Sequence, residues 1–354
     1  MTKTSALPLL LLLLTLLLLP VLARGGDCEC SASEDENRDK AAARPLKIGA
    51  IFAILVSSTA GVLIPISGKW VPSLSPEKDV FFVIKAFAAG VILATAFIHI
   101  LPESFERLTS PCLNEHPWQE FPFAGFIAMV SAIGTLMVDA VATGYFSRSS
   151  IWKPDSGVSD EGIGDAEQGA ARVHAMHGHE HGPAALVVDD GPDEALRHRI
   201  ISQVLELGIV VHSVIIGITL GTSESPSSIR PLLAALCFHQ FFEGIGLGGC
   251  IVQANFRVRS MVTMMLFFAL TTPVGIAVGI GISSTYDENS PTALTVEGVL
   301  DSAAAGILIY MSLVDLLAED FRNPRVQSNW RLQLVINVSL LVGAGLMSLL
   351  GRWA

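Results

Sequence analysis

Eight long apolar stretches limit what this chain of 354 residues can fold into. A helix needs about 20 mostly apolar residues to cross the hydrocarbon of a bilayer. The stretches of about that length are 46–67, 80–101, 122–146, 199–221, 231–252, 259–282, 295–317 and 332–351. Their backbone must satisfy its own hydrogen bonds in lipid, and they lack the alternation of a β-barrel. We therefore predict an all-α polytopic membrane protein with eight transmembrane helices.

The composition supports a membrane protein and excludes several other classes. Hydrophobic residues make up 51% of the chain and charged residues 16%, compared with about 25% charged residues in soluble domains. The net charge of −11 comes largely from segments outside the apolar stretches, and no basic patch indicates a nucleic-acid partner. The chain has no Walker loop, HExxH or GxSxG motif, so we predict no enzymatic activity.

The N-terminus has the pattern of a secretory signal. Lys3 precedes an almost pure leucine run from Leu9 to Leu19, and residues 21–25, which include Ala23 and Gly25, form the candidate cleavage zone. We predict a signal peptide at residues 1–24, followed by an extracellular segment at 25–45. The alternative is an uncleaved first membrane helix, although the run is slightly short for one.

Positive charge predicts the orientation and the domain order. With an outward N-terminus, the outer loops and tail after the first helix carry only Arg107, Arg230 and Arg352, whereas the inner loops carry Lys69, Lys78, Arg148, Lys153, Arg172, Arg197, Arg199, Arg257, Arg259, Arg322, Arg325 and Arg331. This asymmetry predicts a multi-pass plasma-membrane protein with both termini extracellular. Helices 1–3 would occupy 46–146, a cytosolic His-rich loop 147–198, and helices 4–8 199–354. Lys85, near an inner helix end, is expected to extend toward the interface.

The five cysteines divide by their expected side of the membrane. Cys28, Cys30 and Cys112 would face the oxidising exterior, where Cys28 or Cys30 could pair with Cys112. The sequence leaves this pairing open. Cys237 and Cys250 fall within a predicted helix and are expected to act as apolar packing residues.

Two adjacent helices carry residues that suit a metal ion. His239 and Glu243 are four apart and share a helix face. Folding the short connection about Ser225 and Pro226 places His212 and His239 at equal depth, with Glu243 about 6 Å deeper. Ionisable groups are costly in hydrocarbon, and two His with one carboxylate suit Zn²⁺ or Fe²⁺.

Each of these residues also has a structural alternative. His212 alone could be a hydrogen-bonded packing residue, and Glu243 alone could pair across helices. Ser213 and Gln240 more naturally form interhelical hydrogen bonds, unless a second ion is present. The coincidence of depth, face and residue type favours a metal site.

Further ionisable residues suggest a route to and from this site. His99, Glu103 and Glu106 at the outer end of helix two, with a loop group of Glu115, His116 and Glu120, would form an acidic mouth that concentrates cations. The alternative is an ordinary solvated loop. Possible inner stations are Glu206, Asp139 and Asp315, and weaker candidates are Glu297 and Asp301.

The predicted cytosolic loop has a tract of alternating histidines that would bind metal loosely. Its members are His174, His177, His179 and His181. Because the tract lies outside the predicted helices, it would sense, buffer or hand on metal rather than form the transport site. A chance feature of composition is the alternative.

Several motifs together resemble the ZIP family (Zrt/Irt-like proteins), in particular its plant zinc and iron transporters. They are HSVIIGITLG at 212–221, HQFFEGIGLGG at 239–249, HILPESFE at 99–106, TTPVGIAVGIGI at 271–282 and AGILIYMSLVDLLAED at 305–320. The resemblance covers the chain from about residue 46. It implies a 3+2+3 arrangement in which helices two, four, five and seven form the transport core and move against the rest.

By motif position, the resemblance also implies ligands. His212, His239 and Glu243 would be primary ligands, and Ser213 and Gln240 would occupy second-site positions. Many relatives have an acidic residue four after the helix-four histidine, where this chain has Ile216. This difference favours one principal ion.

The resulting hypothesis is an importer of divalent zinc, or of iron or another first-row metal. The metal is the transported substrate, and no prosthetic group is expected. The alternatives are an exporter of the cation-diffusion-facilitator type, a non-transporting metal sensor and an intramembrane metalloenzyme. The sequence leaves open the preferred metal and whether two copies form a homodimer.

Overall fold

The protein is a bundle of long helices. The computed structural model describes residues 39–68, 78–151, 192–253, 256–284, 286 and 289–352, and the regular elements within these ranges are all helical. Seven helices of this part are long and apolar enough to cross a membrane: Ala41–Ser67, Asp79–Leu108, Phe123–Val141, Pro226–Val252, Val258–Ile282, Pro291–Arg322 and Trp330–Gly351. The predicted all-α membrane class is confirmed.

The helix expected to complete eight spans is α7 (Pro192–Thr222). Its described apolar part, Glu206–Thr222, is shorter than a span, so the count of eight stays a prediction. The predicted signal peptide and the His-rich tract lie outside the described residues.

Helix boundaries differ from the predicted ones mainly where polar residues continue a helix. α2 (Lys40–Ser67) begins inside the segment predicted to be extracellular, because the Asp39 side chain caps its first turn by accepting from the amides of Ala41 and Ala42. α6 (Phe123–Ile151) and α7 extend into the predicted loop 147–198 from its two sides. The other long helices are α8 (Pro226–Gln253), α9 (Val258–Ile282) and α13 (Trp330–Gly351).

Two of the spans contain a π-helical turn. α3 (Asp79–Ala94), η3 (Thr95–Ile100) and α4 (Leu101–Leu108) follow one another without a break. The Leu101 amide donates to the Ala96 carbonyl, five residues back. Pro102 comes next and has no amide hydrogen to donate, so it favours this widened turn. π-turns are rare and often occur at functional sites.

The second π-turn lies in the span that follows α9. α10 (Pro291–Tyr310) continues into η4 (Met311–Ala318) and α11 (Glu319–Arg322). Two short helices complete the described part, α5 (Glu115–Trp118) and α12 (Pro324–Ser328).

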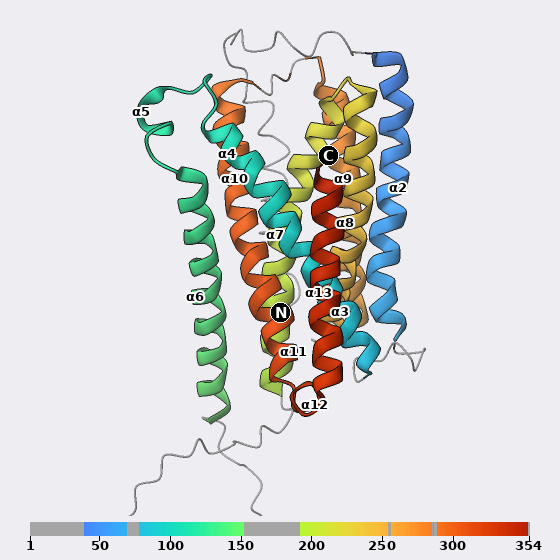
Figure 1. The fold of residues 1–354 in the computed structure, drawn as a ribbon, viewed down its shortest axis with the longest axis vertical. Helices are drawn as coiled ribbons and strands as arrows, with labels where there is room; N and C mark the ends of the chain where they lie inside the picture. The colour runs from blue at the N-terminus through green and yellow to red at the C-terminus, as the bar shows by residue number, and fades with distance from the viewer. Residues whose placement is uncertain are drawn as a thin grey trace, which may run out of the picture.

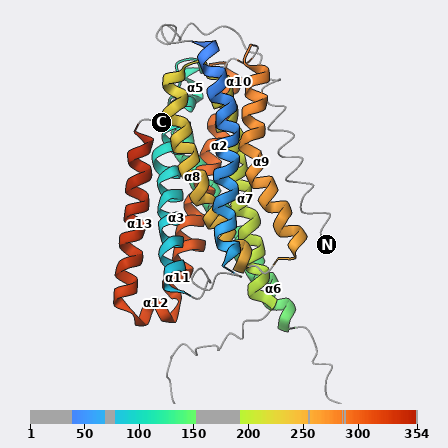
Figure 2. The same cartoon turned by 90° about the vertical axis from the view of Figure 1, so that its right-hand side faces the viewer.

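Four inner helices are each backed by an outer helix (Figures 1 and 2). The closest pairs are α8 with α2, α7 with α9, α3 with α13, and α10 with α6. Buried residues make up 61 to 72% of the apolar windows of the spans containing α3, α8 and α10, against 17 to 44% for the spans of α2, α6, α9 and α13. α3, α7, α8 and α10 are therefore the core, as the resemblance implies.

We call the end of the bundle where α2 begins and α4 ends the upper end, as drawn in Figure 1, and the opposite end, near α12, the lower end. The described chain ends on the upper side, because α13 rises from the lower end toward the position marked C.

Glycines allow the paired helices to touch through their backbones. A Cβ at Gly61 of α2 would overlap the carbonyl oxygen of Phe241 on α8, and one at Gly248 would lie 2.8 Å from the carbonyl oxygen of Val62. Between α7 and α9, a Cβ at Gly217 would lie 2.8 Å from the Thr272 carbonyl oxygen. Small residues permit such close approach in lipid, where packing drives association.

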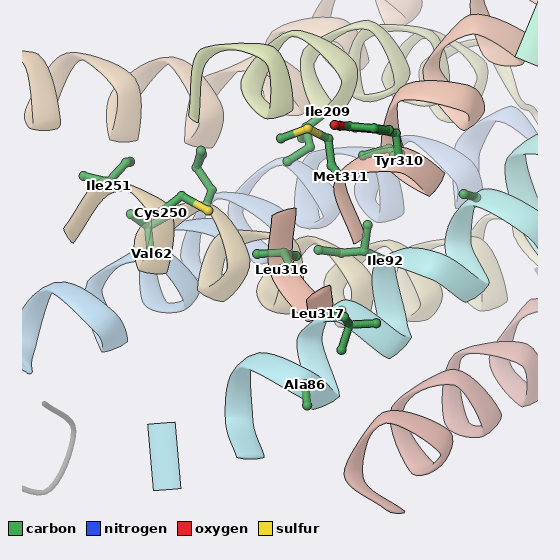
Figure 3. Packing of buried hydrophobic residues seen from close by; sticks show 14 of the residues in the cluster. Val62, Ala86, Ile92, Ile209, Cys250, Ile251, Tyr310, Met311, Leu316 and Leu317 are labelled. Carbon is green, nitrogen blue, oxygen red and sulfur yellow. The ribbon is translucent and has the colours of Figure 1, made fainter. Parts of the chain in front are cut away.

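Apolar side chains fill much of the core. Figure 3 shows Ile92 of α3, Cys250 and Ile251 of α8, and Leu316 and Leu317 of η4 within one cluster. Cys250 thus packs in apolar surroundings, as predicted from its place in a helix.

Lys85 does not extend to the interface as expected. It is buried, and its Nζ donates to Asp320 Oδ1 at 2.9 Å and lies 3.7 Å from Glu319 Oε2. The expectation was wrong because two acidic residues near the end of the α10 span neutralise the ammonium within the protein, and a buried charge persists when it is paired.

The α2–α8 contact gives a test of the packing. Gly61→Ala should lower the thermal stability of the detergent-purified protein, by about 1–3 kcal/mol in free energy of unfolding, because the added methyl meets backbone. Gly49→Ala on the same helix is the control, since a Cβ there meets nothing within 4 Å. Equal melting temperatures for the two variants, measured by fluorescence-detected gel filtration after heating, would contradict the packing argument.

Candidate functional site

Three histidines from three core helices face one another in the bundle. His99 lies in η3, His212 in α7 and His239 in α8. Their ring centroids are 6.2 Å apart for His99 and His212, 6.0 Å for His99 and His239, and 5.9 Å for His212 and His239. We call these three residues the histidine cluster.

The hairpin geometry expected from the sequence agrees with this placement for His212 and His239. His99, in contrast, was expected in an outer mouth with Glu103 and Glu106. It belongs to the cluster because α3, η3 and α4 form one continuous span that rises from the lower to the upper end, and η3 lies inside that span among the core helices.

The other members of the predicted mouth differ from His99 in their exposure. Glu106 is exposed. His116 Nδ1 and Glu120 Oε2 lie 2.9 Å apart, and their side chains are 79% and 63% exposed. These residues are exposed to solvent, and their role as a cation-concentrating mouth stays a prediction. Glu103, one turn above His99, is the member of the group that remains close to the core.

The other predicted ligands are buried, and in sequence they lie close to the histidines of the cluster. Glu243 follows His239 by one turn of α8, while Ser213 and Gln240 adjoin the two histidines, and all three side chains are buried. In the described part of the protein, both ring nitrogens of His212 and of His239 and both carboxylate oxygens of Glu243 have no hydrogen-bond partner. Burying such groups unpaired is costly, which indicates a role other than packing.

The side chains of this site are too far apart, as they stand, to form a metal coordination sphere. Among the described residues, no group of three or more His, Cys, Asp or Glu side chains is close enough to hold an ion as it stands. Zinc–nitrogen bonds of about 2.0–2.1 Å put the ring centroids of two imidazoles on one ion about 5 Å apart. The centroids of His212 and His239 are 5.9 Å apart, so a small inward shift would bring both rings to one ion.

Ile216 faces away from the polar site. It is buried in an apolar cluster with Ala50 and Ile54 of α2 and Leu220 of α7. The position that is acidic in many ZIP relatives is therefore used here for helix packing.

A carboxylate on α10 takes a larger part than the sequence suggested. Asp301 is buried, its Oδ1 lies 3.9 Å from Nδ1 of His212, and its Oδ2 lies 4.0 Å from Nε of Arg107. Arg107, counted as an outer-loop residue in the sequence, is inside the span Asp79–Leu108. Arg107 follows His99 by eight residues, which puts both on one helix face about two turns apart. This spacing is the sequence signal that could have placed Arg107 near the site.

The other acidic residues lie elsewhere on the core helices. Glu206 is buried six residues before His212 on α7. Asp315 is buried in η4. Tyr310 donates to Asp139 at 3.2 Å, which links α10 to α6. Asp139 thus serves helix packing, whereas Glu206 lies on the lower side of the histidine cluster.

These features define a class: a polytopic α-helical membrane protein with buried histidines and carboxylates at the centre of its core. Residues 44–351 match the family model described as ZIP Zinc transporter. The chain belongs to this family.

Curated relatives share most of the chain. It is 60% identical to "Zinc transporter 5" of Oryza sativa subsp. japonica, covering 94% of this chain and 93% of the relative. It is 54% identical to "Zinc transporter 3" of Arabidopsis thaliana, covering 93% and 91%. It is 47% identical to "Fe(2+) transport protein 2" of Oryza sativa subsp. japonica, covering 92% and 90%.

The position of His99 leads to a direct test. His99→Ala should weaken zinc binding by the purified protein at least tenfold, because it removes one of three imidazoles that face each other. Glu106→Gln, on the same helix but exposed, should leave binding unchanged. Equilibrium dialysis with radioactive zinc measures both. Equal affinity of the His99 variant and the wild type would place His99 outside the site.

Proposed function

We propose that this protein imports divalent zinc, and secondarily iron or another first-row metal, across a membrane into the cytosol. The observation that carries the proposal is the buried set of His212, His239 and Glu243, with His99 facing both histidines. The ring nitrogens of His212 and His239 and the carboxylate oxygens of Glu243 have no hydrogen-bond partner among the residues that the structure describes. Membership of the ZIP family and the names of its relatives support the substrate class.

In the proposed mechanism, His212, His239 and Glu243 bind the ion, and His99 completes the set as the rings move inward. Ser213 and Gln240 orient these side chains or contact a second ion. A ligand must be deprotonated to bind, so binding should weaken as the pH falls. Nitrogen and carboxylate ligands suit both Zn²⁺ and Fe²⁺, which is why they discriminate weakly between them.

The path below the histidine cluster is closed by apolar packing. Leu247 and Ile251 continue the α8 face of His239 and Glu243, and both are fully buried. Release toward Glu206 and the lower end therefore requires the core helices to shift. The histidines at 174, 177, 179 and 181 would then receive the ion in the cytosol.

The proposed orientation places the upper end outside the cell. Both termini would then be extracellular and residues 147–198 cytosolic, in agreement with the distribution of Lys and Arg. The proposed membrane is the plasma membrane, reached through a signal peptide at residues 1–24. An exporter of the cation-diffusion-facilitator type, a sensor and a metalloenzyme gain no support from the family or its named relatives.

Uptake measurements test the proposed ligands. His239→Ala and Glu243→Ala should each reduce uptake of radioactive zinc into intact cells to near background, because each removes a buried ligand. His116→Ala is the control, since His116 is exposed and pairs only with Glu120 among the described residues. Surface labelling should show all three variants in the membrane. Near-normal uptake by both ligand variants would exclude this site.

A further inference from the structure

Arg107 holds a group of carboxylates directly above the histidine cluster. Its Nη2 lies 2.5 Å from Glu103 Oε1, its Nη1 pairs with Glu297, and its Nε is 4.0 Å from Asp301 Oδ2. Tyr286 also donates to Glu297. One guanidinium thus bridges α4 and α10 through three acidic side chains. We call Arg107 and these three side chains the arginine clasp.

The clasp adjoins the histidine cluster. Glu103 is one turn above His99 on the same helix face. Asp301 contacts the guanidinium on one side and lies 3.9 Å from His212 on the other. An ion approaching the cluster from the upper end along this face of α4 and α10 would meet the clasp first.

The charges of the clasp do not balance. Three carboxylates surround one guanidinium, so a net charge of about −2 remains in a largely buried environment. Asp301 is 2% exposed, and neither of its oxygens has a hydrogen-bond partner in the described part of the protein. Burying excess negative charge is costly, and a divalent cation would offset it.

Close helix packing sets the position of Arg107. A Cβ at Gly298 of α10 would lie 2.6 Å from Leu108 Cγ and 3.3 Å from Arg107 Cβ. The glycine therefore lets α4 approach α10, and Glu297 and Asp301 on either side of it reach the guanidinium. The long arginine side chain could move upward with Glu297 while releasing Glu103 and Asp301.

We propose that Arg107 is a tethered cation that closes the upper entrance by occupying Glu103 and Asp301, and that an entering divalent ion displaces it from these two carboxylates. A divalent ion has twice the charge of the guanidinium and interacts correspondingly more strongly with a carboxylate. A monovalent ion has no such advantage. Arg107 thereby lowers the affinity of the entrance and favours divalent ions.

Removal of the guanidinium tests this competition, which rests on the proposed zinc transport. Arg107→Gln should tighten zinc binding by the purified full chain about five- to tenfold, a size expected when one competing charge contact is lost. The KM for zinc uptake should fall in parallel, without a rise in maximal rate. Equilibrium dialysis measures the Kd, and initial rates in intact cells separate KM from maximal rate.

Two variants complete the design. Arg352→Gln removes an exposed arginine beyond α13, at the same end of the bundle, and should change neither constant. Arg107→Met keeps an aliphatic stem without charge and should tighten binding as Arg107→Gln does. Unchanged or weaker binding in both Arg107 variants, or loss of both proteins from the membrane, would make Arg107 a structural clasp and overturn the proposal. A wild type that neither binds nor takes up zinc would instead contradict the proposed transport function.

Discussion

Direct contact between helix backbones at glycines is the constraint on which the rest of the structure depends. Within the pairs α2–α8 and α7–α9, a Cβ added at Gly244 or Gly279 would meet backbone at 3.0 Å or less. The glycines of α7 and α8 that face α3 and α10 meet side chains instead: Gly246 faces Ile92. Side chains can change rotamer where backbones cannot. Movement of α7 and α8 against α3 and α10 is therefore easier than movement within the closely packed pairs α2–α8 and α7–α9.

The two sides of the histidine cluster are closed by different kinds of interaction. Above it, Arg107 and its acidic partners close the route with charge. Below it, buried apolar side chains that include Leu247 and Ile251 close the route. A cation can displace another cation from carboxylates, whereas it gains nothing from apolar side chains. Opening the lower side therefore requires helix movement, while the upper side could open through one side chain.

The sequence predicts those features of the fold and the site that depend on helix periodicity and on short connections between helices. The equal depth of His212 and His239 follows from the short connection between α7 and α8, and their rings do lie 5.9 Å apart. The place of His99 depends on which face of η3 is turned toward α7 and α8, which hydropathy does not reveal. The contacts of Lys85 with Asp320 and of Arg107 with Asp301 join residues about two hundred positions apart. Nothing local in the sequence selects such partners.

The distribution of acidic residues bears on how many ions the core could hold. Ile216 packs against α2 at the position that is acidic in many ZIP relatives. Asp301 of α10 instead supplies a carboxylate 3.9 Å from His212. Once Arg107 releases Glu103 and Asp301, these two carboxylates and Glu243 carry about three negative charges beside neutral imidazoles. One divalent ion would leave a net charge of about −1 and two would leave about +1, and unpaired charge of either sign is costly in a low-dielectric core. The absence of a carboxylate at position 216, rather than the charge balance, is therefore what favours one ion.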